Sequence, residues 1–219
     1  MKTLFLALAM VLTAAAPLTA QDPDAKAQQL AKDVWKASGG ENWTHIKRLT
    51  FTFIVEQDGK QLASAAHDWD VAAGTDRVQW KGKSVTVNLA APAQEEDGKA
   101  AYARWVNDSY WLLAPLKILD PGVKLSYEGQ KESDGAPCET LRLSFAQVGL
   151  TPGDQYVFYI DPQSKLLRAW DYIPSADMTM HGTWEKYQPV GGLQLATEHN
   201  FGGKIIRFAD VKAEQTTAK

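Results

Sequence analysis

Cysteine is almost absent from this sequence: Cys138 is the only one among 219 residues. A single cysteine cannot close a disulfide within the chain, so the folded state must depend on the burial of apolar side chains. The position of Cys138 beside Pro137 favours a small buried or loop thiol over a redox or intermolecular role. No cysteine lies near residue 21, and we therefore expect no lipid anchor at the start of a processed chain.

Long hydrophobic runs and an excess of positive charge are also absent. Beyond the first residues no segment reaches about 18 consecutive apolar residues, so no transmembrane helix is expected. The formal net charge is −3 and no block of lysine or arginine occurs, which argues against nucleic acid as a partner. With 45% hydrophobic and 22% charged residues, the composition is that of an ordinary globular protein and excludes a disordered chain.

Common catalytic and metal-binding motifs are missing as well. The chain has no G-x-S-x-G elbow, P-loop, Rossmann glycine pattern, C-x-x-C pair or H-E-x-x-H helix. His67 with Asp68 and Asp70 is the best metal-like cluster, but strand alternation points His67 to one face and both aspartates to the other. The sequence thus predicts no catalytic residue, no metal and no cofactor. A structural or surface role is expected for each histidine: His45, His67, His181 and His199.

The first twenty residues have the layout of a secretory signal peptide. Lys2 precedes an apolar run from Leu4 to Leu12, and small residues follow up to Ala20. We expect cleavage after Ala20 and export to the periplasm. Residues 21–219 then amount to about one domain of ordinary size, and we expect them to form a single folded unit.

Two segments carry apolar residues at helical spacing. The first is bounded by an Asp-Pro pair and a Gly-Gly pair, which predicts a helix over residues 23–38. The second runs from Lys99 to Leu113 and ends before Pro115. The acidic stretch 91–98 that precedes it is expected to be a solvated loop.

The rest of the chain alternates apolar and polar residues with the period of two that is typical of half-buried strands. Turn signals such as Asp58-Gly59 and Asp161-Pro162 divide it into about eleven strands, one of them expected over Met178 to Tyr187. Because the connections are short, neighbouring strands should be antiparallel. The predicted fold class is mainly β with two helical segments, in which a strongly curled or partly closed antiparallel sheet carries the helices on one face.

Aromatic residues are abundant, with eight Trp, seven Tyr and seven Phe. A curled sheet with such an inner face could fill itself as an ordinary core or could hold a hydrophobic ligand, and the pattern leaves both interpretations open. The candidate residues of this inner face are Phe51, Phe53, Trp69, Trp80, Val87, Leu143, Phe145, Phe158, Trp170, Met178, Met180 and Trp184.

The second helical segment has more apolar surface than one helix face needs. Trp105, Trp111 and Leu113 contribute to this surface, and we add them to the candidate ligand-binding residues. We hypothesise that the segment closes the sheet as a lid. A lid whose Trp105 and Trp111 were replaced by alanine would lose ligand affinity more than stability, whereas core tryptophans would do the opposite.

Several motifs resemble the LolA-like and LolB-like outer-membrane lipoprotein carriers and a bacterial branch of that superfamily. One of them is FYIDPQSKLL, which resembles the strand, turn and strand signature of these carriers. The resemblance extends over roughly residues 24 to 212. Its motifs, in chain order, are Asn107 to Pro115, Gly149 to Asp154, Phe158 to Leu167, Trp184 to Tyr187, Gly191 to Leu195 and Ile205 to Val211.

This resemblance implies a half-open β-barrel whose mouth is covered by helices and whose apolar interior accepts acyl chains. The expected function is that of a periplasmic carrier or binder of a hydrophobic ligand, either a lipid or an acylated protein. Because the superfamily also contains envelope sensors and at least one enzyme, a sensor or protein-interaction module stays open, and an enzyme is less favoured. An envelope protein is a further potential partner, and a monomer is expected.

Overall fold

The computed structural model describes residues 23–146, 150–151 and 153–216. The predicted leader, residues 1–20, lies outside them, as do Gly149 and Pro152 of the 149–154 motif. The helices are α1 (Pro23–Ala37), α2 (Gly40–Trp43), α3 (Glu96–Leu113) and the short 3-10 helix η1 (Ala114–Leu116). The strands are β1 (Ile46–Gln57), β2 (Lys60–Asp70), β3 (Thr75–Trp80), β4 (Lys83–Asn88), β5 (Val123–Ser133), β6 (Ala136–Phe145), β7 (Gln155–Ile160), β8 (Leu167–Ser175), β9 (Met178–Thr183), β10 (Glu185–Val190), β11 (Leu193–Phe201) and β12 (Lys204–Gln215).

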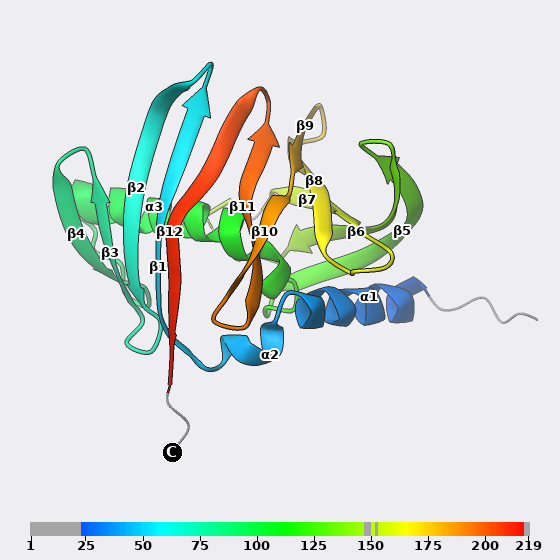
Figure 1. Ribbon diagram of the computed structural model, residues 1–219, viewed down its shortest axis with the longest axis horizontal. Helices are drawn as coiled ribbons and strands as arrows, with labels where there is room; N and C mark the ends of the chain where they lie inside the picture. The colour runs from blue at the N-terminus through cyan, green and yellow to red at the C-terminus, as the bar shows by residue number, and fades with distance from the viewer. Residues whose placement is uncertain (1–22, 147–149, 152, 217–219) are drawn as a thin grey trace, which may run out of the picture.

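These strands form one antiparallel sheet in the order β4-β3-β2-β1-β12-β11-β9-β8-β7-β6-β5, with β10 paired to β11 beside this path. Most neighbours in the sheet are also neighbours in sequence, and the main exception is β12, which returns to pair with β1. The sheet curls without closing and leaves β4 and β5 as its edges (Figure 1). The predicted fold class, a curled antiparallel sheet covered by helices, is confirmed.

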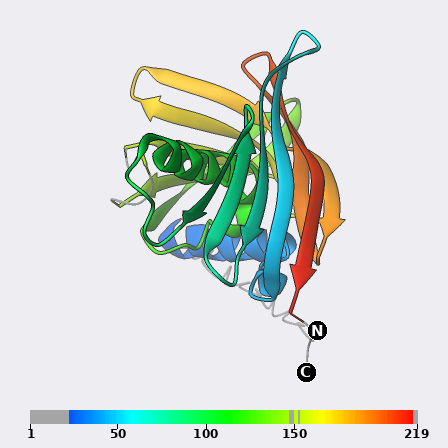
Figure 2. The same cartoon turned by 90° about the vertical axis from the view of Figure 1, so that its left-hand side faces the viewer.

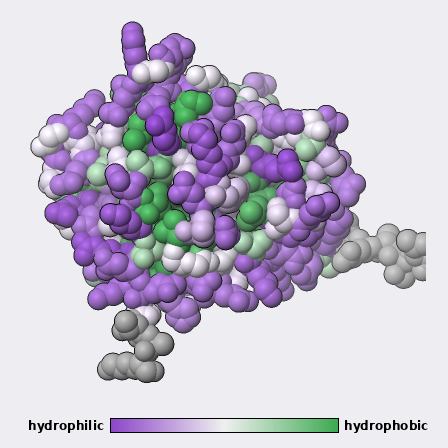
Figure 3. All heavy atoms as spheres, in the orientation of Figure 1, coloured by the Kyte–Doolittle hydropathy of each residue, from purple (hydrophilic) through white to green (hydrophobic). Residues whose placement is uncertain are grey.

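The β1–β2 hairpin shows how alternation produces a sheet with two different faces. Asp58 and Gly59 form its turn with φ values of 51° and 72°, as a two-residue type I′ turn requires. Phe51 and Phe53 point into the core, whereas Thr52 between them lies on the other face. In the view of Figure 1 these strands lie in front of α3, and the same side of the molecule is mainly hydrophilic in Figure 3.

Helix α1 packs against β5 and η1. It ends where Gly39 adopts a φ of 84°, in the left-handed region that favours glycine, and the Gly39 backbone lies against Gly192 in the β10–β11 turn. The prediction of a helix over residues 23–38 is therefore confirmed. Its buried side chains recur at helical spacing: Ala27, Leu30, Ala31 and Val34.

Helices α1 and α3 lie on the same, concave side of the sheet (Figure 2). The main hydrophobic core fills the space between α1, the C-terminal end of α3 and the inner face of the sheet. A second, smaller cluster joins the N-terminal half of α3 to β2, β3 and β4, and its buried members are Ala65, Val78, Trp80, Val87 and Ala101.

Two predicted element boundaries are wrong. Helix α3 begins at Glu96 inside the expected loop, because Glu96 and Asp97 in its first turn are favoured by the partial positive charge of a helix N-terminus. The expected strand Met178 to Tyr187 is two strands, β9 and β10. They are separated by Trp184, whose side chain is buried in the core and whose backbone N–H donates to the Arg168 carbonyl at 2.7 Å.

Candidate functional site

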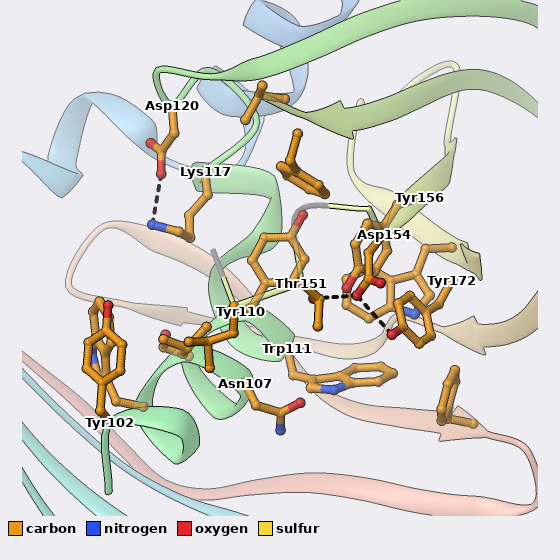
Figure 4. Close-up of a pocket in the computed structure, with 18 of the residues that line it drawn as sticks. Tyr102, Asn107, Tyr110, Trp111, Lys117, Asp120, Thr151, Asp154, Tyr156 and Tyr172 are labelled. Carbon is orange, nitrogen blue, oxygen red and sulfur yellow. Dashed lines mark hydrogen bonds and ion pairs between the residues drawn. The ribbon is translucent and has the colours of Figure 1, made fainter. Parts of the chain in front are cut away.

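A cavity of about 540 Å³ lies on the concave side of the sheet beside α3. One wall is α3, and the others are the segment from Lys117 to Val123, the loop before β7, and the inner faces of β7 and β8 (Figure 4). These segments are far apart in the sequence. The curl of the sheet brings β7 and β8 round to face α3, and this arrangement creates the cavity.

Aromatic side chains make up much of the cavity lining. They pack on one another, with ring centroids 4.4 Å apart for Trp111 and Trp170 and 4.8 Å apart for Tyr156 and Trp170. Such mutual contacts restrict the rings and give the cavity side of the wall an apolar surface. The aromatic lining residues are Tyr102, Trp105, Tyr110, Trp111, Phe145, Tyr156, Trp170, Tyr172 and Phe201.

Trp170 fits into this wall because its neighbour on β9 is a glycine. Gly182 pairs with Trp170 across the β8–β9 ladder. A Cβ atom at residue 182 would lie 2.9 Å from Trp170 Nε1 and 3.0 Å from a ring carbon of Phe201. The absence of a side chain at this position therefore allows both rings to reach the cavity.

Polar groups gather at two places in the lining (Figure 4). Asp154 precedes β7 and is only 9% exposed; its Oδ2 accepts hydrogen bonds from Thr151 Oγ1 at 2.6 Å and from the Tyr172 hydroxyl at 2.9 Å. Elsewhere in the lining, Lys117 Nζ lies 2.8 Å from Asp120 Oδ2 in an ion pair.

Three tyrosines of the lining, Tyr110, Tyr156 and Tyr172, are held in the neutral form. Burial raises the pKa of Tyr172 to about 12, and the hydrogen bond and charge of Asp154 add to the effect. Burial likewise raises the pKa of Tyr156, with smaller contributions from Tyr172 and Asp154, and raises that of Tyr110. All three phenols are therefore uncharged hydrogen-bond donors near neutral pH.

The structure places four of the predicted ligand-binding residues in the cavity lining: Trp105, Trp111, Phe145 and Trp170. Most of the remaining candidates are packed away from the cavity in one of the two hydrophobic clusters. Those in the main core are Phe51, Phe53, Trp69, Leu113, Leu143, Phe158 and Trp184, and those in the smaller cluster are Trp80 and Val87.

Met178 and Met180, predicted as ligand-binding residues of the inner face, belong to neither hydrophobic cluster and do not line the cavity. They share the face of Gly182 but follow the turn of the β8–β9 hairpin, near its tip. Strand β11 pairs with β9 only where Phe201 meets Gly182, so no strand among the described residues lies beside the tip on that side. Met178 is consequently 50% exposed.

Sequence reasoning missed several lining residues, chiefly Asp154, Tyr156, Tyr172 and Phe201. A signal existed for two of them. Tyr156 is two residues before Phe158 on β7, and Tyr172 is two residues after Trp170 on β8. Because side chains two residues apart on a strand lie on the same face, each tyrosine shares the face of a predicted ligand-binding residue. Asp154 gave no such signal, because its burial depends on a turn that the pattern does not specify.

His67 forms a buried charge network outside the cavity lining. Its Nδ1 lies 2.7 Å from Asp76 Oδ2, and its Nε2 lies 3.0 Å from Asp108 Oδ2. Burial lowers the pKa of His67, but the hydrogen bonds and charges of Asp108 and Asp76 outweigh this effect and raise the pKa to about 9. The ring is therefore a cation that donates to both carboxylates, which agrees with the expected structural role.

This network fastens α3 to the sheet, since Asp108 belongs to α3 and its partner His67 to β2. Trp105 on the same helix lies 5.3 Å from Trp69, measured between ring centroids. Trp111 is 8% exposed and belongs to the main core. In this structure the helix that we expected to act as a lid packs against the sheet and forms one wall of the cavity.

Other features of the described residues bear on site chemistry. They contain no group of three or more His, Cys, Asp or Glu side chains placed to hold a metal ion.

No helix within the part of the chain that the structure covers is both long and apolar enough to cross a membrane. Cys138 is a free and buried thiol on β6, as expected, and burial raises its pKa.

Comparisons with known proteins agree on the fold. No protein-family model matches this chain, and no curated protein sequence matches it. A LolA superfamily protein from Nitrosomonas europaea is 8% identical with a TM-score of 0.55, over 87% of this chain and 94% of that one. A DUF1329 family protein from Desulfovibrio piger is 12% identical with a TM-score of 0.52, over 90% and 96%.

A third similar structure is a domain from Vibrio parahaemolyticus that is named for outer membrane lipoprotein sorting. It is 9% identical with a TM-score of 0.53, over 90% of this chain and 95% of that one. At such identities the likeness concerns the fold alone. The chain has a LolA-like fold, as its motifs predicted.

Proposed function

We propose that this protein binds a hydrophobic ligand, a lipid or the acyl chains of a lipoprotein, in the cavity between α3 and strands β7 and β8. The observation that carries the proposal is the cavity of about 540 Å³ with its aromatic lining. This volume falls in the range of roughly 300–1,000 Å³ that is common for small-molecule sites. Each Å² of apolar ligand surface removed from water there contributes about 25 cal/mol.

The fold and the sequence support a carrier. Similar structures include a LolA superfamily protein and a domain named for lipoprotein sorting, and an apolar cavity is the site that acyl carriage requires. We further propose that residues 1–20 direct export to the periplasm and that residues 21–219 act there as one monomeric domain. In this role the protein binds its ligand without transforming it and passes it to a membrane or an envelope protein.

Filling the cavity tests this proposal. Val106 lines the cavity from α3, whereas Ala103 on the same helix is exposed to solvent. The variant Val106→Trp should occupy space that the ligand needs and weaken the binding of an apolar fluorescent dye by about tenfold or more. Ala103→Trp adds the same side chain outside the cavity and should leave dye affinity unchanged.

Both variants are compared with the unmodified protein by dye titration, and their urea unfolding midpoints show whether they are folded. Equal dye affinity in the folded Val106→Trp variant and the unmodified protein would contradict binding in this cavity. Absence of dye binding to the unmodified protein would contradict the proposed function itself.

A further inference from the structure

Asp154 is a buried carboxylate in the cavity wall that no cation of the described chain neutralises. Its side-chain partners within the described residues are the hydroxyls of Thr151 and Tyr172, and both donate to Oδ2. The second oxygen, Oδ1, accepts no hydrogen bond from that part of the chain. The residue is 9% exposed, and Oδ1 is not among the fully buried atoms that lack a partner, so a ligand in the cavity could donate a hydrogen bond to this oxygen.

The positive charge in the lining is already neutralised. Among the lining residues that the structure describes, Lys117 is the only cation, and its Nζ lies 2.8 Å from Asp120 Oδ2. The lining therefore carries one uncompensated negative charge, at Asp154. A cationic group entering the cavity would be attracted to this charge, and an anionic group would be repelled.

The rings around Asp154 favour the same kind of group. Tyr172 donates to Asp154 directly, and the Tyr156 ring lies 5.2 Å from the Tyr172 ring and 4.8 Å from the Trp170 ring. The faces of such rings attract ammonium groups through their quadrupoles. Charge and aromatic surface thus occur together at this end of the cavity (Figure 4).

We infer that the cavity selects an amphiphile with a positively charged amine head, which pairs with Asp154 Oδ1, and an alkyl chain that lies along the aromatic wall. This inference rests on the proposed function and specifies the chemical class of its ligand. An ammonium head supplies both the charge and the N–H donors that Oδ1 lacks. An alcohol supplies a donor without a charge. A carboxylate supplies neither a donor nor a positive charge.

Three amphiphiles with the same alkyl chain separate these heads: dodecylamine, dodecanol and dodecanoate. Each is titrated below its micelle concentration, or for dodecanol below its solubility limit, at neutral pH, as a competitor of the apolar dye. We expect the unmodified protein to bind the amine about tenfold more tightly than the alcohol, and the carboxylate most weakly. Equal affinity for amine and alcohol would overturn the inference, and this comparison needs no variant.

The variant Asp154→Asn tests whether Asp154 causes the preference for the amine, because it removes the negative charge and keeps the shape of the side chain. In this variant the three competitors should bind within about threefold of one another, whereas dye affinity should change little. Glu132→Gln is the matched control, since Glu132 is exposed on β5 and does not line the cavity. It should keep the full preference for the amine.

The outcomes distinguish the inference from the proposed function. If all three amphiphiles displace the dye equally well from the unmodified protein, the cavity binds apolar chains but does not select an amine. A preference for the amine that survives in a folded Asp154→Asn variant would overturn the role of Asp154. If none of the three displaces a bound dye, the proposed acyl-binding function fails instead.

Discussion

The buried imidazolium of His67 links two carboxylates that would otherwise repel each other. Asp76 and Asp108 are both buried and approach the ring from opposite nitrogens. Asp76 Oδ1 is without a hydrogen-bond partner among the described residues, so the positive ring is the principal compensation for this carboxylate. Deprotonation of His67 would leave both aspartates buried without a cation, which is strongly unfavourable.

This arrangement predicts that the protein loses stability at alkaline pH. The pKa of His67 is about 9 in the folded state against 6.5 for an unperturbed histidine, so folding favours the protonated ring. The contribution is fully present below pH 6.5 and is lost as the pH rises through 9, a loss of roughly 3 kcal/mol in the free energy of unfolding. Urea unfolding across this range should show the decrease, and His67→Gln should remove most of it.

His199 provides an internal control, because its pKa is shifted in the opposite direction to that of His67. Burial lowers its pKa to about 4, although a hydrogen bond to the Thr183 carbonyl acts to raise it. Folding therefore favours the neutral ring, and this contribution is present above pH 6.5 and lost as the pH falls through 4. His199→Gln should change only the acid side of the stability profile. A profile of the unmodified protein that stays flat above pH 6.5 would contradict the His67 network.

At the scale of elements, α3 combines two roles that the sequence suggested separately. Its tryptophans belong both to the cavity lining and to the hydrophobic packing, and Asp108 on the helix is hydrogen-bonded to the sheet through His67. A helix fastened in this way cannot move without breaking buried contacts. We therefore regard the cavity as preformed, with α3 as a permanent wall.

The two tryptophans of α3 should differ in their effect on stability. Trp111 is buried, and its ring centroid lies 4.4 Å from that of Trp170, so Trp111→Ala should lower the free energy of unfolding by about 3–5 kcal/mol. Trp105 is half-buried, and Trp105→Ala should lower it less. Urea unfolding of the two single variants measures this difference. A Trp111→Ala variant that kept its unfolding midpoint while losing dye affinity would restore the lid hypothesis.

The elements themselves were largely predictable because their signals are local. Alternation placed Phe51 and Phe53 on the inner face, and the Asp58-Gly59 pair fixed the hairpin between β1 and β2. The failures occur where a tertiary contact overrides the local pattern. The buried Trp184 keeps the facing that alternation predicted, but the run breaks there because β9 pairs with β8 whereas β10 pairs with β11, and no residue near Trp184 in sequence indicates this change of partner.

The cavity was predictable only in part, for a related reason. Alternation shows which residues share a face of the sheet, but not where that face is covered by other elements. Phe158 and Tyr156 have the same facing on β7, yet Phe158 is fully buried in the main core and Tyr156 borders the cavity. The difference depends on how α3 and the loop before β7 lie over the sheet, which the local pattern does not specify.

In the molecule as a whole, the side chains on the inner face of the open sheet pack in two hydrophobic clusters of unequal size. The main core extends along the inner face of the sheet from β6–β8 through β11 and β12 to β1, and the cavity lies at its β7–β8 end, whereas the smaller cluster joins β2, β3 and β4 to α3. A ligand that binds only the folded state stabilises it by mass action, by about 2.7 kcal/mol when its free concentration is 100 times its dissociation constant. The position of the cavity determines which helices and strands the ligand should stabilise most.

We therefore expect an apolar ligand to protect the molecule unevenly against amide hydrogen exchange. The dye used above should slow exchange most in α3, β7 and β8, which form the cavity walls, because these elements lose local openings when the ligand is bound. The hairpin of β3 and β4 contributes no residue to the lining and serves as the internal reference. Val106→Trp should abolish the added protection, and Ala103→Trp should retain it. Protection concentrated in β3 and β4 would place the ligand on the opposite edge of the sheet and contradict binding between α3 and the β7–β8 strands.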